Sequence, residues 1–266
     1  MMRVLRYVVL AFFALLWSWP FLWMLGTALH SLPEAAGPTL SPWPGEFHWE
    51  NFVSAWHSAP FGRYFINTIF VSTTVAFIVA FTSLTAAYAF SHLRFRGRDA
   101  LFMLVLTTMM VPFEAILIPN FVLIGRFGWY NTFAALIIPW SANAFSIFLL
   151  RQALLGLPSE ISDAARIDGC GHLLFLFRVA APLIRPALTT VILVAFLGSY
   201  NALLWPLIVT SDDEHRMLQA GLLAFASDAG VRLNLLMCAS TIIILPTVIL
   251  FIIFQRHYND APSVTR

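Results

Sequence analysis

Carboxylates stand close together in the polar stretch Leu157 to Ala187, which lies between two long apolar runs. Glu160 and Asp163 follow Ser159, so they place negative charge in the first turn of a short helix, where the helix dipole favours it. Ser159 suits the N-cap of this helix, and Gly169 suits the left-handed stop at its other end. A carboxylate presented in this way forms charge-assisted hydrogen bonds with an arginine of another protein. The stretch therefore predicts recognition rather than catalysis.

The helix expected from Ser159 onward has a small, alanine-lined side, with a length of about 13 Å at 1.5 Å per residue. One face carries, at helical spacing, Ile161, Ala164, Ala165 and Asp168. Small side chains let the groove of another protein approach closely, and such a helix-in-groove contact transmits force without chemistry. The alternative is an amphipathic helix that lies on lipid, but alanine binds lipid less well than leucine or phenylalanine. A second short helix is expected from His172 to Ala181, running into Pro182.

Polar residues also group within an apolar run, in the segment LGSYNALLWP. Gly198, Ser199, Tyr200 and Asn201 fall near the middle of that run. A polar side chain in a membrane helix is costly unless it hydrogen-bonds to another helix or to a polar cargo. Ser199, Tyr200 and Asn201 are therefore candidates for a solute path, and hydrogen bonding between helices is the alternative for each of them.

Glu114 lies in another apolar run, between Pro112 and Pro119. A carboxyl group in or near the hydrocarbon normally faces the interior of a helix bundle or sits close to an interface. Glu114 is a further candidate for the solute path, although its place past the middle of the run favours interfacial or interhelical hydrogen bonding. The two prolines predict a bent or broken helix.

No catalytic site and no metal site are expected on this chain. The histidines, all outside the apolar runs, are His30, His48, His57, His92, His172, His215 and His257. Cys170 and Cys238 lie at different levels and do not predict a disulfide. The chain has no lysine, and the phosphate-binding loop of P-loop ATPases requires one. An intramembrane enzyme and an ATPase of this kind are therefore both disfavoured.

The composition places these residues in a lipid bilayer. The 266 residues are 60% hydrophobic and 11% charged, with a mean hydropathy of +0.82, values typical of proteins that cross the membrane several times. A spanning helix takes about 20 apolar residues. Segments of that length are Tyr7 to Leu29, Tyr64 to Phe90, Ala100 to Ile124, Thr132 to Leu150, Ala187 to Thr210 and Leu233 to Phe254. We therefore predict an all-α membrane protein with six transmembrane helices.

The arginines predict the orientation of these helices, because Lys and Arg near the ends of spans favour the cytoplasmic side. With both termini inside, eleven arginines lie on the inner side and four on the outer side. The inner group is Arg3, Arg6, Arg94, Arg96, Arg98, Arg151, Arg166, Arg178, Arg185, Arg256 and Arg266, and the outer group is Arg63, Arg126, Arg216 and Arg232. Both termini and the stretch 157–187, between spans four and five, are therefore expected in the cytoplasm. The net charge of +2 reflects this asymmetry and gives no reason to expect nucleic acid as a partner.

The stretch 157–187 resembles the signature of the inner-membrane permease subunits of binding-protein-dependent ABC importers, which is Glu-Ala-Ala, three residues, Gly, and a Pro further on. Asp163-Ala164-Ala165, Gly169 and Pro182 occupy those positions. The segments LPSEISDAARIDG, LIRPAL and GSYNALLWPLI resemble the carbohydrate-uptake branch, the second permease of maltose and glycerol-phosphate type importers. The similarity extends from FINTIF in the second span through VPFEAILIP to the end of the fifth. Asp163 departs from the usual Glu, and Ala181 from the usual Leu before the proline.

This resemblance implies a single transmembrane permease domain over residues 1–266, with the importer core at about 64–256 and a cytoplasmic coupling loop at 157–187. The chain would be the non-catalytic, channel-forming subunit that imports a sugar or a glycerol-phosphate-type solute across the bacterial inner membrane. Its partners would be a homologous second permease, a pair of ATP-binding subunits and an extracytoplasmic solute-binding protein. No cofactor is implied on this chain, because the partner ATPase would bind ATP and Mg.

The resemblance also assigns the residues that couple this subunit to the ATPase. They are Glu160, Asp163, Ala164, Ala165, Asp168, Gly169 and Pro182. The ATPases would close on ATP and push the segment from Glu160 to His172, rocking the spans from an inward-open to an outward-open state.

Two other classes of transporter compete with this interpretation. A permease for amino acids or peptides has the same architecture, and only the resemblance of GSYNALLWP argues against it. A secondary transporter would be expected to show repeated halves and ionisable groups at the midplane for ion coupling. No internal repeat is visible, and Glu114 is the only acidic residue well inside a predicted span.

Overall fold

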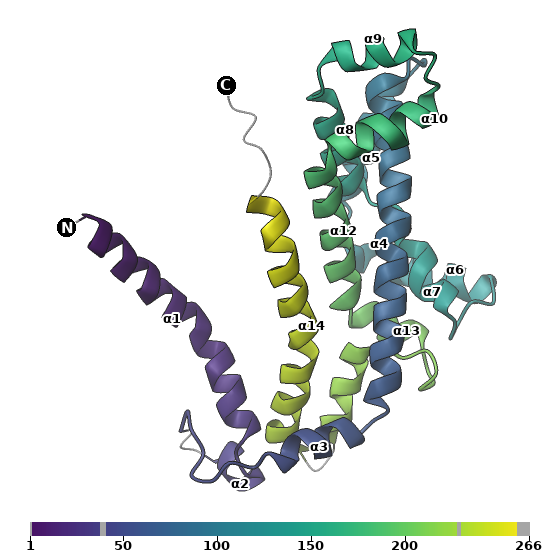
Figure 1. The fold of residues 1–266 in the computed structure, drawn as a ribbon. Helices are drawn as coiled ribbons and strands as arrows, with labels where there is room; N and C mark the ends of the chain where they lie inside the picture. The colour runs from purple at the N-terminus through teal and green to yellow at the C-terminus, as the bar shows by residue number, and fades with distance from the viewer. Residues whose placement is uncertain (1, 38–40, 228–229, 260–266) are drawn as a thin grey trace. The chain divides into compact units, whose positions relative to one another are not determined.

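The computed structural model describes residues 2–37, 41–227 and 230–259, which are mostly helical (Figure 1). The helices are α1 (Met2–Ala28), α2 (Leu32–Ala35), α3 (Glu50–His57), α4 (Phe61–His92), α5 (Arg98–Thr107), α6 (Phe113–Arg126), α7 (Phe133–Ile137), α8 (Ala144–Leu155), α9 (Ser159–Ile167), α10 (His172–Phe175), α11 (Ala181–Leu183), α12 (Arg185–Tyr200), α13 (Leu204–Val209) and α14 (Leu233–Asn259). Turns of 3-10 helix cover Thr108–Met110, Ile138–Trp140 and Leu218–Phe225, and a π-helical turn covers Leu176–Ala180. The two-residue strands β1 (Ala226–Ser227) and β2 (Gly230–Val231) pair antiparallel. The expected all-α fold is confirmed.

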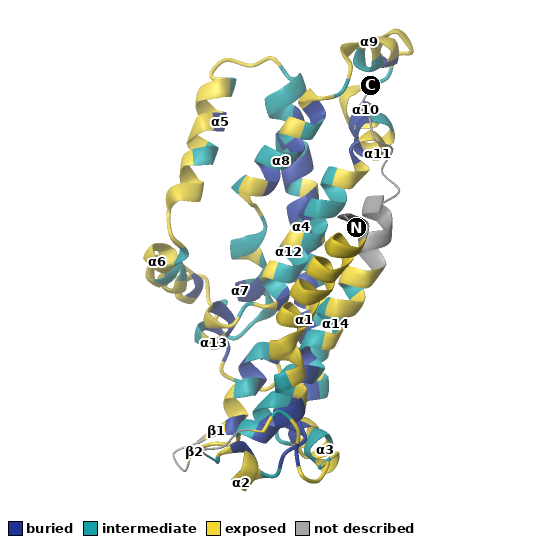
Figure 2. Cartoon of the chain, turned by 90° about the vertical axis from the view of Figure 1, so that its left-hand side faces the viewer, coloured by how far each residue is buried: buried dark blue, intermediate teal, exposed yellow. Residues whose placement is uncertain are grey.

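The chain forms two compact units. The first comprises Met1–Tyr64 and Leu218–Ile252, and the second comprises Phe65–Met217 and Ile253–Arg266. In the first unit, α1 is exposed along most of its length, and its exposed side chains are almost all apolar (Figure 2). All the candidate site residues lie in the second unit. The extreme ends of the chain, Met1 and residues 260–266, lie outside the described residues, so the cytoplasmic position of the termini stays a prediction.

Three single helices are long and apolar enough to cross a membrane: Val4–Ala28, Phe61–His92 and Leu233–Ile252. Three pairs of helices meet the same test only together, because each is bent at a short break. The bends are 99° between Arg98–Met110 and Phe113–Arg126, 44° between Phe133–Trp140 and Ala144–Leu155, and 87° between His172–Leu183 and Arg185–Tyr200. Among the described residues, the expected number of six spans is therefore reached only when each bent pair is counted as one crossing, and the last of these pairs extends into the stretch 157–187 that was expected in the cytoplasm.

The break in the third span occurs at the first of its two prolines. Val111 and Pro112 both have extended backbone, with ψ of 115° and 145°. The ring of a proline disfavours the helical conformation for the residue before it, so the helix stops at Met110 and α6 begins at Phe113. Pro119 lies inside α6 and does not end it. The bent or broken helix expected from these prolines is confirmed.

The second short helix runs further than expected. Helical structure continues from His172 through the π-helical turn into α11, and Pro182 lies inside α11 rather than at the stop. A π-helical turn shifts the hydrogen-bond partners by one residue, and this shift accommodates a proline, which has no N–H to donate. The chain then bends at Ile184, where ψ is 22°.

The interior of the second unit is built around α4. Val71, Val75 and Val79 recur at helical spacing on one side of α4 and are all buried. Leu150 and Leu154 of α8 are buried in the same cluster, and Figure 2 shows the buried stretches of both helices. Because lipid is as apolar as these side chains, close van der Waals packing holds such helices together in a membrane.

Arg151 of α8 contacts both α4 and α5 at one end of this unit. Its Nε donates to the Phe90 carbonyl of α4 at 3.2 Å, and its guanidinium carbon lies 4.1 Å from the centre of the Phe102 ring of α5. The same side chain lies 3.9 Å from the Asp99 carboxylate. The basic hairpin between α4 and α5 is therefore held against α8, near α9 (Figure 1).

Candidate coupling helix and solute cavity

Helix α9 is the short helix expected in the polar stretch, and it begins at Ser159. Its N-cap is Pro158, with φ of −58° and ψ of 136°, so the expectation that Ser159 is the N-cap was wrong by one residue. Pro158 already supplies the extended backbone that precedes a helix, and Ser159 falls in the first turn. There the Ser159 carbonyl accepts a hydrogen bond from the Ser162 hydroxyl at 3.0 Å.

Gly169 ends α9 in the left-handed conformation, as expected. Its φ is +75°. The Cys170 N–H donates to the Ala165 carbonyl at 2.9 Å, and the Gly169 N–H donates to the Arg166 carbonyl at 3.0 Å. These two bonds form a Schellman motif, in which a residue with positive φ closes the last turn. The chain can therefore leave α9 sharply and enter α10.

The outer face of α9, formed by Glu160, Asp163, Ala164 and Ile167, is exposed. Ile167 is 87% exposed, a high value for a large apolar side chain. Among the described residues, neither Glu160 nor Asp163 has an ion-pair partner. The inner face is Ala165, which is buried, and Ile161, which is half-buried. Ile161, Ala164, Ala165 and Asp168 share one side of the helix by their spacing, but the rest of the unit covers only Ile161 and Ala165, and leaves Ala164 and Asp168 exposed.

A small cavity of about 130 Å³ lies beneath α9. Tyr88 of α4 and His172 of α10 line it, and the Tyr88 hydroxyl lies 2.9 Å from Nδ1 of His172. The Tyr88 ring also stacks on His92, with 5.0 Å between the ring centres. These contacts connect the segment that follows α9 directly to the end of α4.

A larger cavity of about 450 Å³ lies at the break between α12 and α13. Its polar side chains are Asn143, Ser146 and Ser199, and Gly198 lies beside them. Val71, Val75 and Val79 of α4 form its apolar wall. A volume of this size is typical of small-molecule sites.

The fifth span does not continue through this region as a single helix. Helix α12 ends at Tyr200 and α13 begins at Leu204, so Gly198 to Asn201 lie at a helix end and not in the middle of a span. Pro206 explains the break: in a continuous helix its ring would clash with the Ala202 carbonyl, which would also lack a donor. The expectation of one spanning helix from Ala187 to Thr210 was therefore wrong.

The sequence-based candidates for the solute path are placed differently around this cavity. Ser199 lines it. Tyr200 is fully buried and stacks on Phe196 at 5.7 Å, while Asn201 donates from Nδ2 to the Leu197 carbonyl at 3.0 Å, and neither lines the cavity. Glu114 is exposed in the first turn of α6 and is not a lining residue either.

Sequence reasoning missed the polar residues that α8 brings to the cavity. Asn143 is the N-cap of α8, and its Oδ1 accepts hydrogen bonds from the Ser146 N–H at 2.9 Å and the Ser146 hydroxyl at 3.1 Å. An Asn just before an apolar helical run is a recognisable N-cap signal. The residues Ser141 to Asn143 therefore indicate that the helix of the fourth span is broken and begins again at Ala144.

An aromatic row forms another part of the lining. The Trp140 ring lies 5.3 Å from that of Phe113 and 6.2 Å from that of Trp205, edge to face in the second case. Trp205 is buried and donates from Nε1 to the Ala135 carbonyl at 2.9 Å. Its indole is therefore fixed, and Trp140 stands half-buried between the other two rings.

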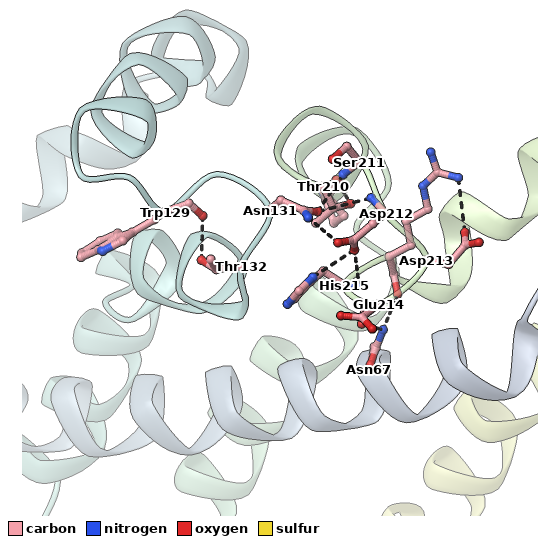
Figure 3. A network of polar contacts seen from close by, with 12 residues as sticks. Asn67, Trp129, Asn131, Thr132, Thr210, Ser211, Asp212, Asp213, Glu214 and His215 are labelled. Atoms are coloured by element: carbon pink, nitrogen blue, oxygen red, sulfur yellow. Dashed lines mark hydrogen bonds and ion pairs between the residues drawn. The ribbon is translucent and has the colours of Figure 1, made fainter.

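The loop that follows α13 is held by two asparagines distant in sequence (Figure 3). Asn67 of α4 donates from Nδ2 to the carbonyls of Glu214 and Arg216 at 2.8 and 2.9 Å. Asn131 has φ of +58°; its Nδ2 donates to the Asp212 carboxylate at 2.5 Å, and its Oδ1 accepts from the Ser211 N–H at 2.9 Å. The loop therefore has one defined conformation.

Asp212 is the anionic centre of this loop. Its pKa lies below the ordinary value of 3.8, chiefly because Asn131 donates to the carboxylate and also because His215 does. The stabilisation from the charged form is complete above the ordinary pKa and is lost only as the pH falls through the lowered one. The loop is therefore expected to keep its conformation at neutral pH. Oxygen and nitrogen atoms of Asp212, Glu214 and His215 lie within 4.8 Å of one another, but those of Asp212 and His215 already bond within the loop.

Comparison with known proteins agrees with this geometry. Residues 78–263 match the family described as the binding-protein-dependent transport system inner membrane component. The chain is 34% identical over 223 residues to the arabinooligosaccharides transport system permease protein AraQ of Halalkalibacterium halodurans, covering 84% of this chain and 80% of that protein. It is 30% identical over 223 residues to the sn-glycerol-3-phosphate transport system permease protein UgpE of Yersinia pestis, covering 81% and 79%.

One solved structure shares the fold across almost the whole chain. It is a chain of a bacterial ABC transporter involved in the import of the acidic polysaccharide alginate. The TM-score is 0.84 with 24% sequence identity, covering 97% of this chain and 96% of the other.

Proposed function

Because this chain belongs to the family of binding-protein-dependent transport system inner membrane components, we propose that it is the channel-forming subunit of an ATP-driven importer for a sugar or a glycerol-phosphate-type solute. The named relatives carry arabinooligosaccharides and sn-glycerol 3-phosphate. The chain itself is a transport component of the inner membrane. In our proposal it works with a homologous second permease, two ATP-binding subunits that hold ATP and Mg, and an extracytoplasmic solute-binding protein.

The observation that supports this proposal best is the free outer face of α9. Two carboxylates that have no ion-pair partner among the described residues, a small alanine and an exposed isoleucine share that face, which suits the groove of a soluble partner better than solvent or lipid. The face lies within the coupling loop 157–187, which we place in the cytoplasm together with both termini. Here Glu160, Asp163, Ala164 and Ile167 would contact the ATPase, while Ala165 and Gly169 would hold the helix in position.

Movement of α9 has a structural route to the cavity. Through Gly169 and Cys170, α9 is continuous with α10, which the Tyr88–His172 contact connects to α4. Further along, α4 carries the three valines of the cavity wall. ATP and the loaded binding protein would act by their different affinities for the inward-open and outward-open states, with α9 as the element that ATPase closure displaces.

Gly169→Val is expected to abolish import and to leave the subunit in the membrane. A valine is strained at a φ of +75°, by about 1–2 kcal/mol or more, so the Schellman stop and the direction of α9 would be lost. Gly171→Val is the matched control, because Gly171 has an ordinary φ of −71° and, as at Gly169, an added Cβ meets nothing within 4 Å. Asp163→Lys, which reverses the charge offered to the ATPase, is expected to abolish import as well.

The measurement is uptake of radiolabelled solute by cells that express each variant, with membrane levels followed by immunoblot. Wild-type uptake by both Gly169→Val and Asp163→Lys would count against α9 as the coupling element. Loss of uptake in Gly171→Val to the same extent would show that the effect of Gly169 is not specific to its backbone conformation.

A further inference from the structure

The cavity at the α12–α13 break has a lining without formal charge. Its polar side chains are one amide and two hydroxyls, those of Asn143, Ser146 and Ser199, and no lysine, arginine, histidine or carboxylate is among the described residues that line it. A phosphate or carboxylate taken out of water needs a paired charge or several strong donors. The side chains that this chain contributes to the cavity offer no such charge.

Two of the polar side chains have hydrogen-bonding capacity left over. Asn143 uses its Oδ1 for the start of α8, but its Nδ2 makes no hydrogen bond within the part of the chain that the structure describes. The Ser199 hydroxyl likewise has no partner among the residues described. The Ser146 hydroxyl already donates a hydrogen bond to Oδ1 of Asn143. The cavity therefore presents an amide donor from α8 and a hydroxyl from α12.

An aromatic surface lies in the same cavity. Trp140 is half-buried between Phe113 and the fixed indole of Trp205. A flat ring packs well against the C–H face of a sugar ring, whose hydroxyl groups then project sideways to hydrogen-bond with polar neighbours. Apolar and aromatic walls with a few placed polar groups are the usual composition of a small-molecule site.

Gly198 leaves open space next to these groups. It lies in the last turn of α12, and a Cβ added to it would meet no atom within 4 Å. A larger side chain at this position would therefore project into the cavity without displacing the protein. The break in the helix and the absence of a side chain at Gly198 together give the cavity its room.

We propose that this cavity is a solute site that selects an uncharged polyhydroxyl compound, a neutral saccharide, against phosphorylated or acidic solutes. The solute lies against Trp140, hydrogen-bonds to Asn143 Nδ2 and the Ser199 hydroxyl, and occupies the space left by Gly198. The inference rests on the proposed transport function and narrows its substrate class. It also makes Gly198 a residue that sets the size of the accepted solute.

The test uses the complete importer, with its second permease, ATPase pair and binding protein, reconstituted in proteoliposomes. The probes are arabinotriose as the neutral solute, and sn-glycerol 3-phosphate and an alginate trisaccharide as the anions. We expect ATP-dependent uptake of arabinotriose and uptake of the two anions that is at least tenfold slower. Gly198→Leu is expected to lower arabinotriose uptake at least tenfold, and Ser199→Ala several-fold.

Gly125→Leu is the matched control for the added bulk. Gly125 lies in α6, away from the cavity lining, and a Cβ there also meets nothing within 4 Å. Uptake of arabinotriose by the Gly125→Leu importer is expected to equal that of the wild type. Uptake of either anion at the rate of arabinotriose or faster, or wild-type uptake by Gly198→Leu, would overturn the proposed site. An importer whose ATP hydrolysis and uptake both fail to respond to the loaded binding protein would count against the transport function instead.

Discussion

Replacing Ala164 by tryptophan should abolish ATP-driven import while the subunit stays in the membrane at its normal level. Ala164 lies on the outer face of α9, between Glu160 and Ile167, and is exposed. An indole there has room in the isolated subunit but would stand between α9 and a protein groove that must approach closely. The expected loss is nearly complete, because every transport cycle in our proposal requires this contact.

Two measurements separate this effect from misfolding. Uptake by cells reports on transport, and co-purification of the ATP-binding subunits with the solubilised permease reports on docking. Ala100→Trp is the control, since Ala100 is also an exposed alanine, near the start of α5 and outside the coupling loop. Normal co-purification and normal uptake with Ala164→Trp would place the docking surface elsewhere.

Asn67→Leu is expected to have the second largest effect, at the other end of α4. The Asn67 side chain is buried and supplies the donors for the carbonyls of Glu214 and Arg216. Leucine fills a similar volume but donates nothing, so both part-buried hydrogen bonds are lost, and a carbonyl left unpaired where water does not reach it costs about 1–3 kcal/mol. We expect the loop after α13 to lose its defined conformation and uptake to fall more than tenfold.

This loss should differ in kind from the loss caused by Ala164→Trp. The ATP-binding subunits are expected to co-purify normally with Asn67→Leu, because α9 is unchanged, while the Tm of the solubilised subunit falls. Asn120→Leu serves as the control: Asn120 lies half-buried in α6 and makes no side-chain hydrogen bond among the described residues. An Asn67→Leu importer with wild-type uptake and Tm would show that the two hydrogen bonds are dispensable.

Features set by local chemistry could be predicted from the sequence. The left-handed stop at Gly169 and the break at Pro112 each follow from the conformational limits of one or two residues. The six apolar segments can be recognised because a helix that crosses the bilayer needs about 20 apolar residues. Pro206 is also a local signal for the break before α13, but the long apolar run around it favours a single span.

Features set by packing could not be predicted in this way. Periodicity identifies which residues of α9 share a face, but only the contacts of Ala165 and Ile161 with the rest of the unit decide which face turns outward. The cavity combines α4, α8, α12 and α13, so Asn143 and Ser199 could not be brought together from their positions in the sequence. The bond between Asn131 and Asp212 joins residues 81 positions apart for the same reason.

A photoreactive amino acid placed at position 167 reports most directly on what covers α9. Ile167 is 87% exposed and lies on the outer face, so a cross-linker there reaches whatever protein docks on the helix. In the assembled importer, illumination is expected to give a covalent adduct with an ATP-binding subunit. Adducts with lipid alone, from an importer that still hydrolyses ATP and transports, would contradict the assignment of α9 as the coupling helix.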